Sequence, residues 1–128
     1  MEAGLVFSKC GGHLYWHVPA DRSQVLLPDS SSLWDVLWAS REILGGFAHT
    51  HPWDGPAAPS QTDLTSFVAI ESGLGRRLLW PIVTFTDVQF VYWEDAQKDY
   101  ACRPRVPLQF TLSLPDAELI QRLRELSR

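Results

Sequence analysis

Two histidines one residue apart, a proline-rich loop and a Ser-x-x-Asp step are the residues of this chain whose types and spacing could do chemistry. The stretch reads FAHTHPWDGPAAPSQTD from Phe47 to Asp63. Because side chains two residues apart on a strand point to the same side, His49 and His51 would present two imidazoles to one point. Catalytic zinc binds three His, Asp or Glu ligands and a water. The pattern therefore predicts a zinc site with Asp63 as the third ligand.

Each half of this pattern has a simpler interpretation when it is taken alone. A single His-x-His pair is weak evidence of metal binding, and Ser60 with Asp63 is typical of a helix cap. Helix capping and core packing do not predict the two halves together, with a stiff loop between them. The joint pattern therefore favours a metal site.

The motif HTHP followed by SQTD resembles the metal-binding signature of the JAMM (MPN-plus) metalloproteases, including those of bacteria and phages. These are zinc peptidases and isopeptidases, and they include deubiquitinases. The resemblance implies that His49, His51 and Asp63 bind zinc and that Ser60 helps to stabilise the tetrahedral intermediate. The loop between the histidines and Ser60 is one residue longer than is usual in that family.

The resemblance also implies a glutamate general base upstream of the histidines, on the first strand. In that family the motif is Glu-x-x-Gly before apolar residues, whereas MEAGLVF has one residue between Glu2 and Gly4. Glu2 is the favoured base, and Glu42, on a charged stretch nearer the histidines, is the alternative. Trp53 follows the strand and its proline directly, so it would line the cleft and contact substrate, or else anchor the loop.

The elements that must position these residues alternate between strands and helices. Periodicity and turn residues predict a hairpin, a helix stopped by glycines, the histidine strand, a capped helix, two more strands, a further strand and an amphipathic helix. In order these are Leu5 to Ser8 with Leu14 to Val18, 33–44 before Gly45-Gly46, 46–50, Ser60 to about Gly73, two runs within 78–95, PLQFTLSL at 107–114, and 115–128. Five tryptophans are expected in the core: Trp16, Trp34, Trp38, Trp80 and Trp93.

Composition predicts one folded domain. The chain has 128 residues, of which 45% are hydrophobic and 20% charged, as in ordinary globular proteins. Interleaved strands and helices predict a layered α/β domain with a mixed β-sheet flanked by helices. The resemblance specifies a JAB/MPN-like (cytidine-deaminase-like) fold over residues 1–128, without the N-terminal helix usual in that family.

Charge and cysteine content limit the classes of partner. A net charge of −4 argues against nucleic acid, and no apolar run is long enough to cross a membrane. The two distant cysteines favour a reducing, cytoplasmic setting. The resemblance implies cleavage after the C-terminus of a ubiquitin-like protein, with a partner protein supplying specificity. A metal-free scaffold subunit and a zinc hydrolase of a cell-wall or phage-related peptide are the alternatives.

Overall fold

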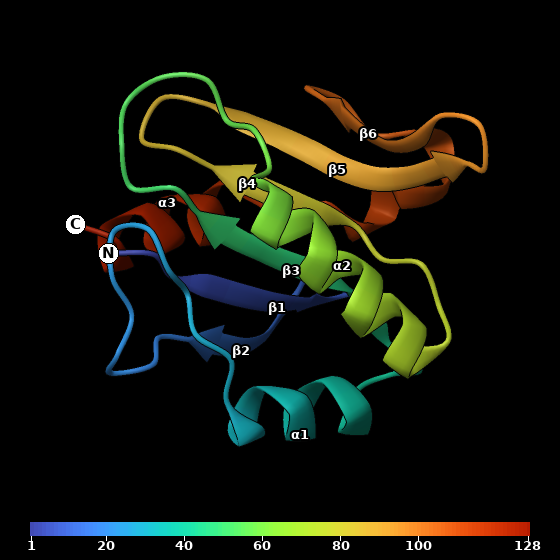
Figure 1. Ribbon diagram of the computed structural model, residues 1–128, viewed down its shortest axis with the longest axis horizontal. Coiled ribbons are helices and arrows are strands. Elements are labelled where there is room, and N and C mark those ends of the chain that lie inside the picture. Colours follow the sequence, from blue (N-terminus) through green and yellow to red (C-terminus); the bar gives the residue numbers. More distant parts are fainter.

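A six-stranded mixed sheet forms the centre of the molecule in the computed structural model, which describes residues 1–128. Its strand order is β2-β1-β3-β4-β5-β6, and only the β3–β4 pair is parallel (Figure 1). The elements are β1 Gly4–Ser8, β2 His13–His17, α1 Ser31–Ala39, β3 Leu44–Thr50, α2 Gln61–Leu74, β4 Trp80–Val83, β5 Val88–Asp95, β6 Asp99–Arg103, the 3-10 helix η1 Leu108–Ser113, and α3 Ala117–Leu126. The prediction of an α/β fold with a mixed sheet is confirmed.

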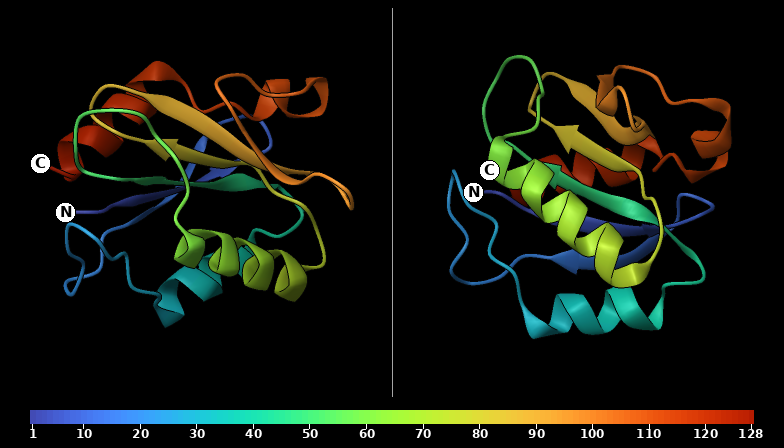
Figure 2. Two further views of the ribbon diagram at one scale, coloured as in Figure 1. Left: turned by 45° about the horizontal axis from the view of Figure 1, so that its top comes forward. Right: turned by 45° about the vertical axis from the view of Figure 1, so that its right-hand side comes forward.

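Helices cover both faces of the sheet. Helices α1 and α2 lie on one face, and α3 with η1 lies on the other (Figure 2). The strands alternate accordingly, because Val6 belongs to the apolar cluster under α1 and α2 whereas Leu5 and Phe7 pack with α3. None of the three α-helices combines the length and the apolar character that a membrane-spanning segment needs.

The parallel strands β3 and β4 are joined by α2, as parallel pairs require a crossover. Strand β3 is buried along its whole length and pairs with β1 on its other side. The loop after β3 leads into α2, whose first turn therefore returns over the carboxyl end of β3. This arrangement brings the start of the chain and the start of α2 close to the carboxyl end of β3, the strand that carries the histidines.

Helix α1 is shorter than predicted, and the glycines after it have a different role. The helix ends at Ala39, and β3 already begins at Leu44. A Cβ at Gly45 would lie 2.4 Å from the Ser8 carbonyl oxygen, and one at Gly46 would lie 1.9 Å from that of Leu79. These glycines permit close approach of neighbouring chain segments, so they belong to the strand and do not stop the helix.

The predicted strand over residues 107–114 is wrong, because this segment forms η1. Phe110 packs against the α3 side of the sheet, while Leu108 and Leu112 are more than four-fifths exposed. The place beside β5 is occupied by β6, a polar strand that the hydrophobic pattern did not reveal. A turn with Asp99 at a φ of 62° returns the chain into β6.

The expectation for the tryptophans holds fully only for Trp80, which has no exposed surface and stacks on Phe67. Trp38 is 55% exposed, so its assignment to the core is wrong; the Arg41 guanidinium lies over its indole ring. The other three predicted core tryptophans are half-buried: Trp16, Trp34 and Trp93. The helical spacing of an aromatic residue does not show whether its ring packs in the core or forms a cation–π pair at the surface.

Candidate metal centre

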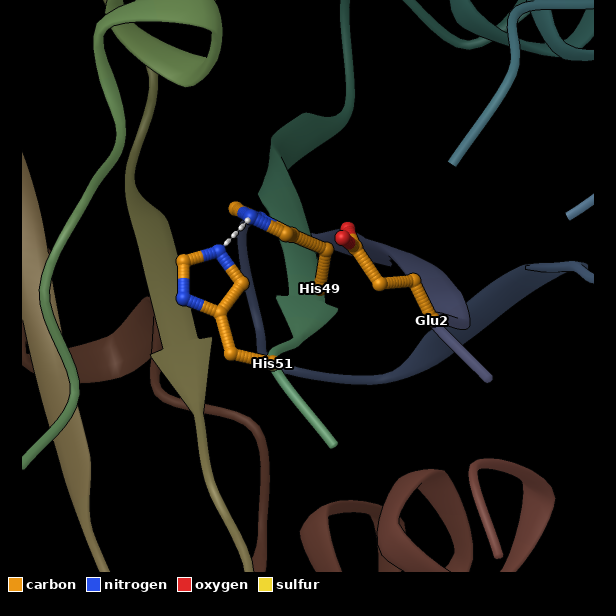
Figure 3. A group of neighbouring side chains, drawn as sticks. All are labelled: Glu2, His49 and His51. Carbon is orange, nitrogen blue, oxygen red and sulfur yellow. Dashed lines mark hydrogen bonds between the residues drawn. The ribbon is translucent and has the colours of Figure 1, made fainter. Parts of the chain in front are cut away.

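His49 and His51 lie at the carboxyl end of β3 and point to the α2 side of the sheet. Their Nε2 atoms are 3.1 Å apart, and both side chains are almost completely buried (Figure 3). The single residue between them puts both imidazoles on one face of the strand, as predicted. The pair therefore presents two nitrogens to one small volume.

Asp63 reaches both imidazoles from the first turn of α2. Its Oδ1 lies 3.2 Å from His49 Nε2, and its Oδ2 lies 3.0 Å from His51 Nε2. The position of the carboxylate is fixed by a capping box, in which Ser60 Oγ accepts from the Asp63 N–H and Asp63 Oδ2 accepts from the Ser60 N–H. The Ser-x-x-Asp spacing thus both starts the helix and aims the carboxylate at the histidines.

Glu2 completes the cluster from the segment just before β1, the strand that pairs with β3. Gly4 pairs with His49, and the Thr50 N–H donates to the Ala3 carbonyl, so the same antiparallel register places Glu2 beside His51. The Glu2 carboxylate and the two imidazoles each offer a ligand atom within 4.8 Å of the others (Figure 3). The residue is buried although it precedes the first strand.

The two carboxylates of the cluster have opposite electrostatic environments. Burial raises the pKa of the Glu2 carboxyl above its ordinary value, although the neighbouring imidazoles of His49 and His51 oppose this. Burial also acts to raise the pKa of Asp63, but hydrogen bonds to His49 and His51 outweigh it and hold that pKa well below the usual range. Asp63 is therefore held in its ionised form, and Glu2 is the carboxyl better suited to accept a proton.

The donor set fits a zinc ion. Donors at about 2.0–2.2 Å from a tetrahedral zinc lie roughly 3.3–3.6 Å from one another. The two imidazole nitrogens are 3.1 Å apart, and Asp63 presents a different oxygen to each of them, at 3.2 Å from His49 and 3.0 Å from His51, so each contact is within a few tenths of an ångström of that spacing. His51 Nδ1 is buried without a hydrogen-bond partner, so the polar contacts of this ring are those of its Nε2 atom, with His49 and Asp63.

Ser60, Trp53 and Glu42 take different places relative to this cluster. Ser60 and Trp53 line the pocket around the histidines, and the indole of Trp53 lies 4.7 Å from the His51 ring between centroids. Glu42 is exposed and precedes β3 at its far end, roughly 20 Å along the strand from the histidines. The structure therefore brings Glu2, and not Glu42, to the cluster.

The cluster opens into a cavity of about 360 Å³ with several apolar residues in its walls. The sequence did not predict these apolar wall residues, which come from the loop before α1 and from the sheet and α2. No motif identifies them, because apolar residues in strands and helices are also typical of the ordinary core. The apolar wall residues are Val25, Leu26, Leu27, Phe47, Phe67, Ile70 and Trp80.

Comparisons of the sequence with protein-family models and with curated proteins found no match. The likeness to the JAMM family therefore depends on the motif residues and on the geometry described above. That geometry unites four of the five residues that the family motif implies as functional around one point, and the fifth, Ser60, caps the helix that carries Asp63.

Proposed function

We propose that this protein is a zinc-dependent peptidase or isopeptidase of the JAMM type. The observation that carries the proposal is the convergence of His49, His51 and Asp63 with the buried carboxylate of Glu2 on the neighbouring strand. Three ligands with a separate carboxylate beside them are the set that metal-assisted hydrolysis requires. A metal-free scaffold would have no need of this set.

In the proposed reaction zinc supplies Lewis acidity toward the scissile carbonyl and lowers the pKa of water. Glu2 accepts a proton from the attacking water and delivers it to the leaving amine as the C–N bond breaks, which yields a carboxylate and an amine. The Ser60 hydroxyl proton is not used by the helix cap, because Ser60 Oγ acts there as an acceptor. It is free to donate to the oxygen of the tetrahedral intermediate.

The proposed substrate is the C-terminal tail of a ubiquitin-like protein, either in a precursor or joined to a lysine side chain. The cavity beside the cluster, with Phe47, Ile70 and Leu27 among its walls, suits an apolar side chain of such a tail. The short loops of this chain leave recognition of the folded part of the substrate to a partner protein. Two free cysteines fit a reducing, cytoplasmic setting.

The test compares zinc content with hydrolysis of a ubiquitin whose C-terminus is joined to the lysine of a fluorescent peptide. We expect one zinc per chain in the wild type, little zinc in His49→Ala and Asp63→Asn, and full zinc in Glu2→Gln with a rate at least about a hundredfold lower. Glu42→Gln is the matched control and should keep the wild-type rate.

Three results would contradict the proposal. Wild-type protein without zinc would support the scaffold alternative. Cleavage of a cell-wall peptide and not of the ubiquitin conjugate would move the substrate to the other alternative. Loss of zinc together with activity in Glu2→Gln would make Glu2 a ligand and not the base.

A further inference from the structure

The main chain of Glu2 is held from a loop outside the sheet. Its N–H donates to the Ser23 carbonyl at 2.7 Å, and its carbonyl accepts from Arg22 Nη1 at 3.1 Å. The same Nη1 atom donates to the Leu126 carbonyl at 2.9 Å, at the carboxyl end of α3. One guanidinium nitrogen therefore joins the residue before β1 to the last turn of a helix on the far face of the sheet.

A second set of contacts ties that helix end to the histidine strand. The Thr50 hydroxyl, between the two histidines, lies 2.5 Å from Ser127 Oγ, which donates in turn to the Leu123 carbonyl. Thr50 Oγ1 also accepts from the Ala3 N–H at 2.9 Å. The end of α3 is thus a common anchor for β3 and for the segment that carries Glu2.

The β1–β3 ladder does not itself fix Glu2. Its last rung is the bond from the Thr50 N–H to the Ala3 carbonyl, one residue before the chain reaches Glu2. Arg22 forms no ion pair, so its donors serve main-chain carbonyls. Its charge also lies at the carboxyl end of α3, where a helix favours a cation.

We propose that Arg22 is a positioning residue for Glu2: its bonds to the Glu2 and Leu126 carbonyls hold the Glu2 carboxylate beside the histidine pair. This inference rests on the proposed hydrolysis, in which Glu2 moves the proton. Arg22 does not touch the reacting atoms. Its loss should therefore impair the proton transfer step and leave metal binding intact, because small displacements of a catalytic group are costly.

The test uses Arg22→Met, which keeps the aliphatic stem and removes the donors, and Arg22→Lys, which keeps one nitrogen. Because a single nitrogen makes both bonds, the lysine variant should recover much of the function. We expect Arg22→Met to keep full zinc and nearly the wild-type KM for the ubiquitin–peptide conjugate while kcat falls roughly ten- to hundredfold. Arg122→Met, which removes an exposed arginine of α3, is the control.

Amide hydrogen exchange measured by NMR provides a readout that does not depend on turnover. In Arg22→Met the amides of Glu2 and Ala3 should exchange faster, while the amides in the middle of α2 should not change. Unchanged exchange at Glu2, or a wild-type kcat in Arg22→Met beside an inactive Glu2→Gln, would overturn the positioning role alone. A wild-type rate in Glu2→Gln would instead overturn the proposed function.

Discussion

At the scale of single residues, Asp63 has two tasks that share the same atoms. Its Oδ2 accepts from the Ser60 N–H at 2.8 Å and also lies 3.0 Å from His51 Nε2. A hydrogen bond to a ligand oxygen from outside the metal's own shell fixes the direction of that ligand. The helix cap therefore also orients the carboxylate of the candidate metal centre, through the Ser60 main-chain N–H, which a change of the Ser60 side chain would leave in place.

Ser60→Ala should keep its zinc but lose most of its turnover, because the hydroxyl acts on the intermediate and not on the metal. It should also lose about 1 kcal/mol of the free energy of unfolding, since Ser60 is the N-cap of α2. Ser30→Ala is a matched control, because Ser30 caps α1 in the same way. Similar losses of stability in both variants with equal rates of hydrolysis would reduce Ser60 to a cap.

The sequence predicts the site residues to different degrees. His49, His51 and Asp63 could be identified because a strand period and a capping spacing encode their convergence locally. Glu2 could be predicted only through a family resemblance, since long-range contacts, among them the pairing of β1 with β3, place it beside the histidines. Arg22 could not be predicted, because its contacts join a loop to the carboxyl end of a helix about a hundred residues later.

At the scale of elements, a buried carboxylate joins α2 to β4 and β6. Glu71 accepts hydrogen bonds from the Leu78 N–H at 2.8 Å, Trp80 Nε1 at 3.1 Å and Arg77 Nη1 at 3.0 Å, and from the Tyr100 hydroxyl. Burial and the neighbouring carboxylate of Glu71 raise the pKa of Tyr100. This cluster holds the end of α2 against the sheet, on the side away from the metal centre.

Glu71→Ala should lower the free energy of unfolding by about 3 kcal/mol or more, because it leaves the buried donors of Leu78 and Trp80 without an acceptor. Glu71→Gln should lose less, since its amide oxygen can still accept. Glu94→Ala, which removes an exposed glutamate of β5, should change stability by less than about 0.5 kcal/mol. Urea unfolding measures all three, and equal losses in Glu71→Ala and Glu94→Ala would contradict the assignment.

The hydrophobic pattern of the sequence predicted helices and strands correctly where the buried residues follow the pattern typical of that element. Strand β4 is a uniformly apolar run, and the buried residues of α3 recur at helical spacing, so their type could be predicted. Segment 107–114 alternates like a strand, but Pro107 removes a donor and the place beside β5 is taken by β6. Which segment pairs beside β5 is decided by tertiary contacts, and the local sequence pattern of a segment does not contain this information.

At the scale of the whole molecule, stability should depend on pH through His17. Its ring is buried, and Nε2 donates to the Pro28 carbonyl at 2.6 Å. Burial lowers the pKa of His17 below its ordinary value of 6.5, although the hydrogen bond to Pro28 opposes this. The unfolded chain therefore binds a proton at His17 at a higher pH than the folded chain does.

As pH falls below about 6.5 toward the lower pKa of folded His17, the free energy of unfolding should decrease, and above this window His17 should contribute no slope. His17→Gln should flatten this part of the profile. His13→Gln, a change at an exposed histidine of the same strand, should not. Denaturant unfolding in EDTA measures the slope for metal-free protein, so that metal release does not contribute to it. Equal slopes in wild type and His17→Gln would contradict the assignment to His17.

The sequence separations within the cluster also set the order in which it assembles during folding. His49 and His51 are only two residues apart in the chain, and Asp63 follows His51 after a separation of only 12 residues. The β1–β3 pairing that brings Glu2 must instead close a separation of 47 residues. Because longer loops cost more entropy to close, we expect the ligands to gather before the base arrives. For the proposed hydrolase, a nascent chain would then hold its metal while it is still unable to cleave other chains around it.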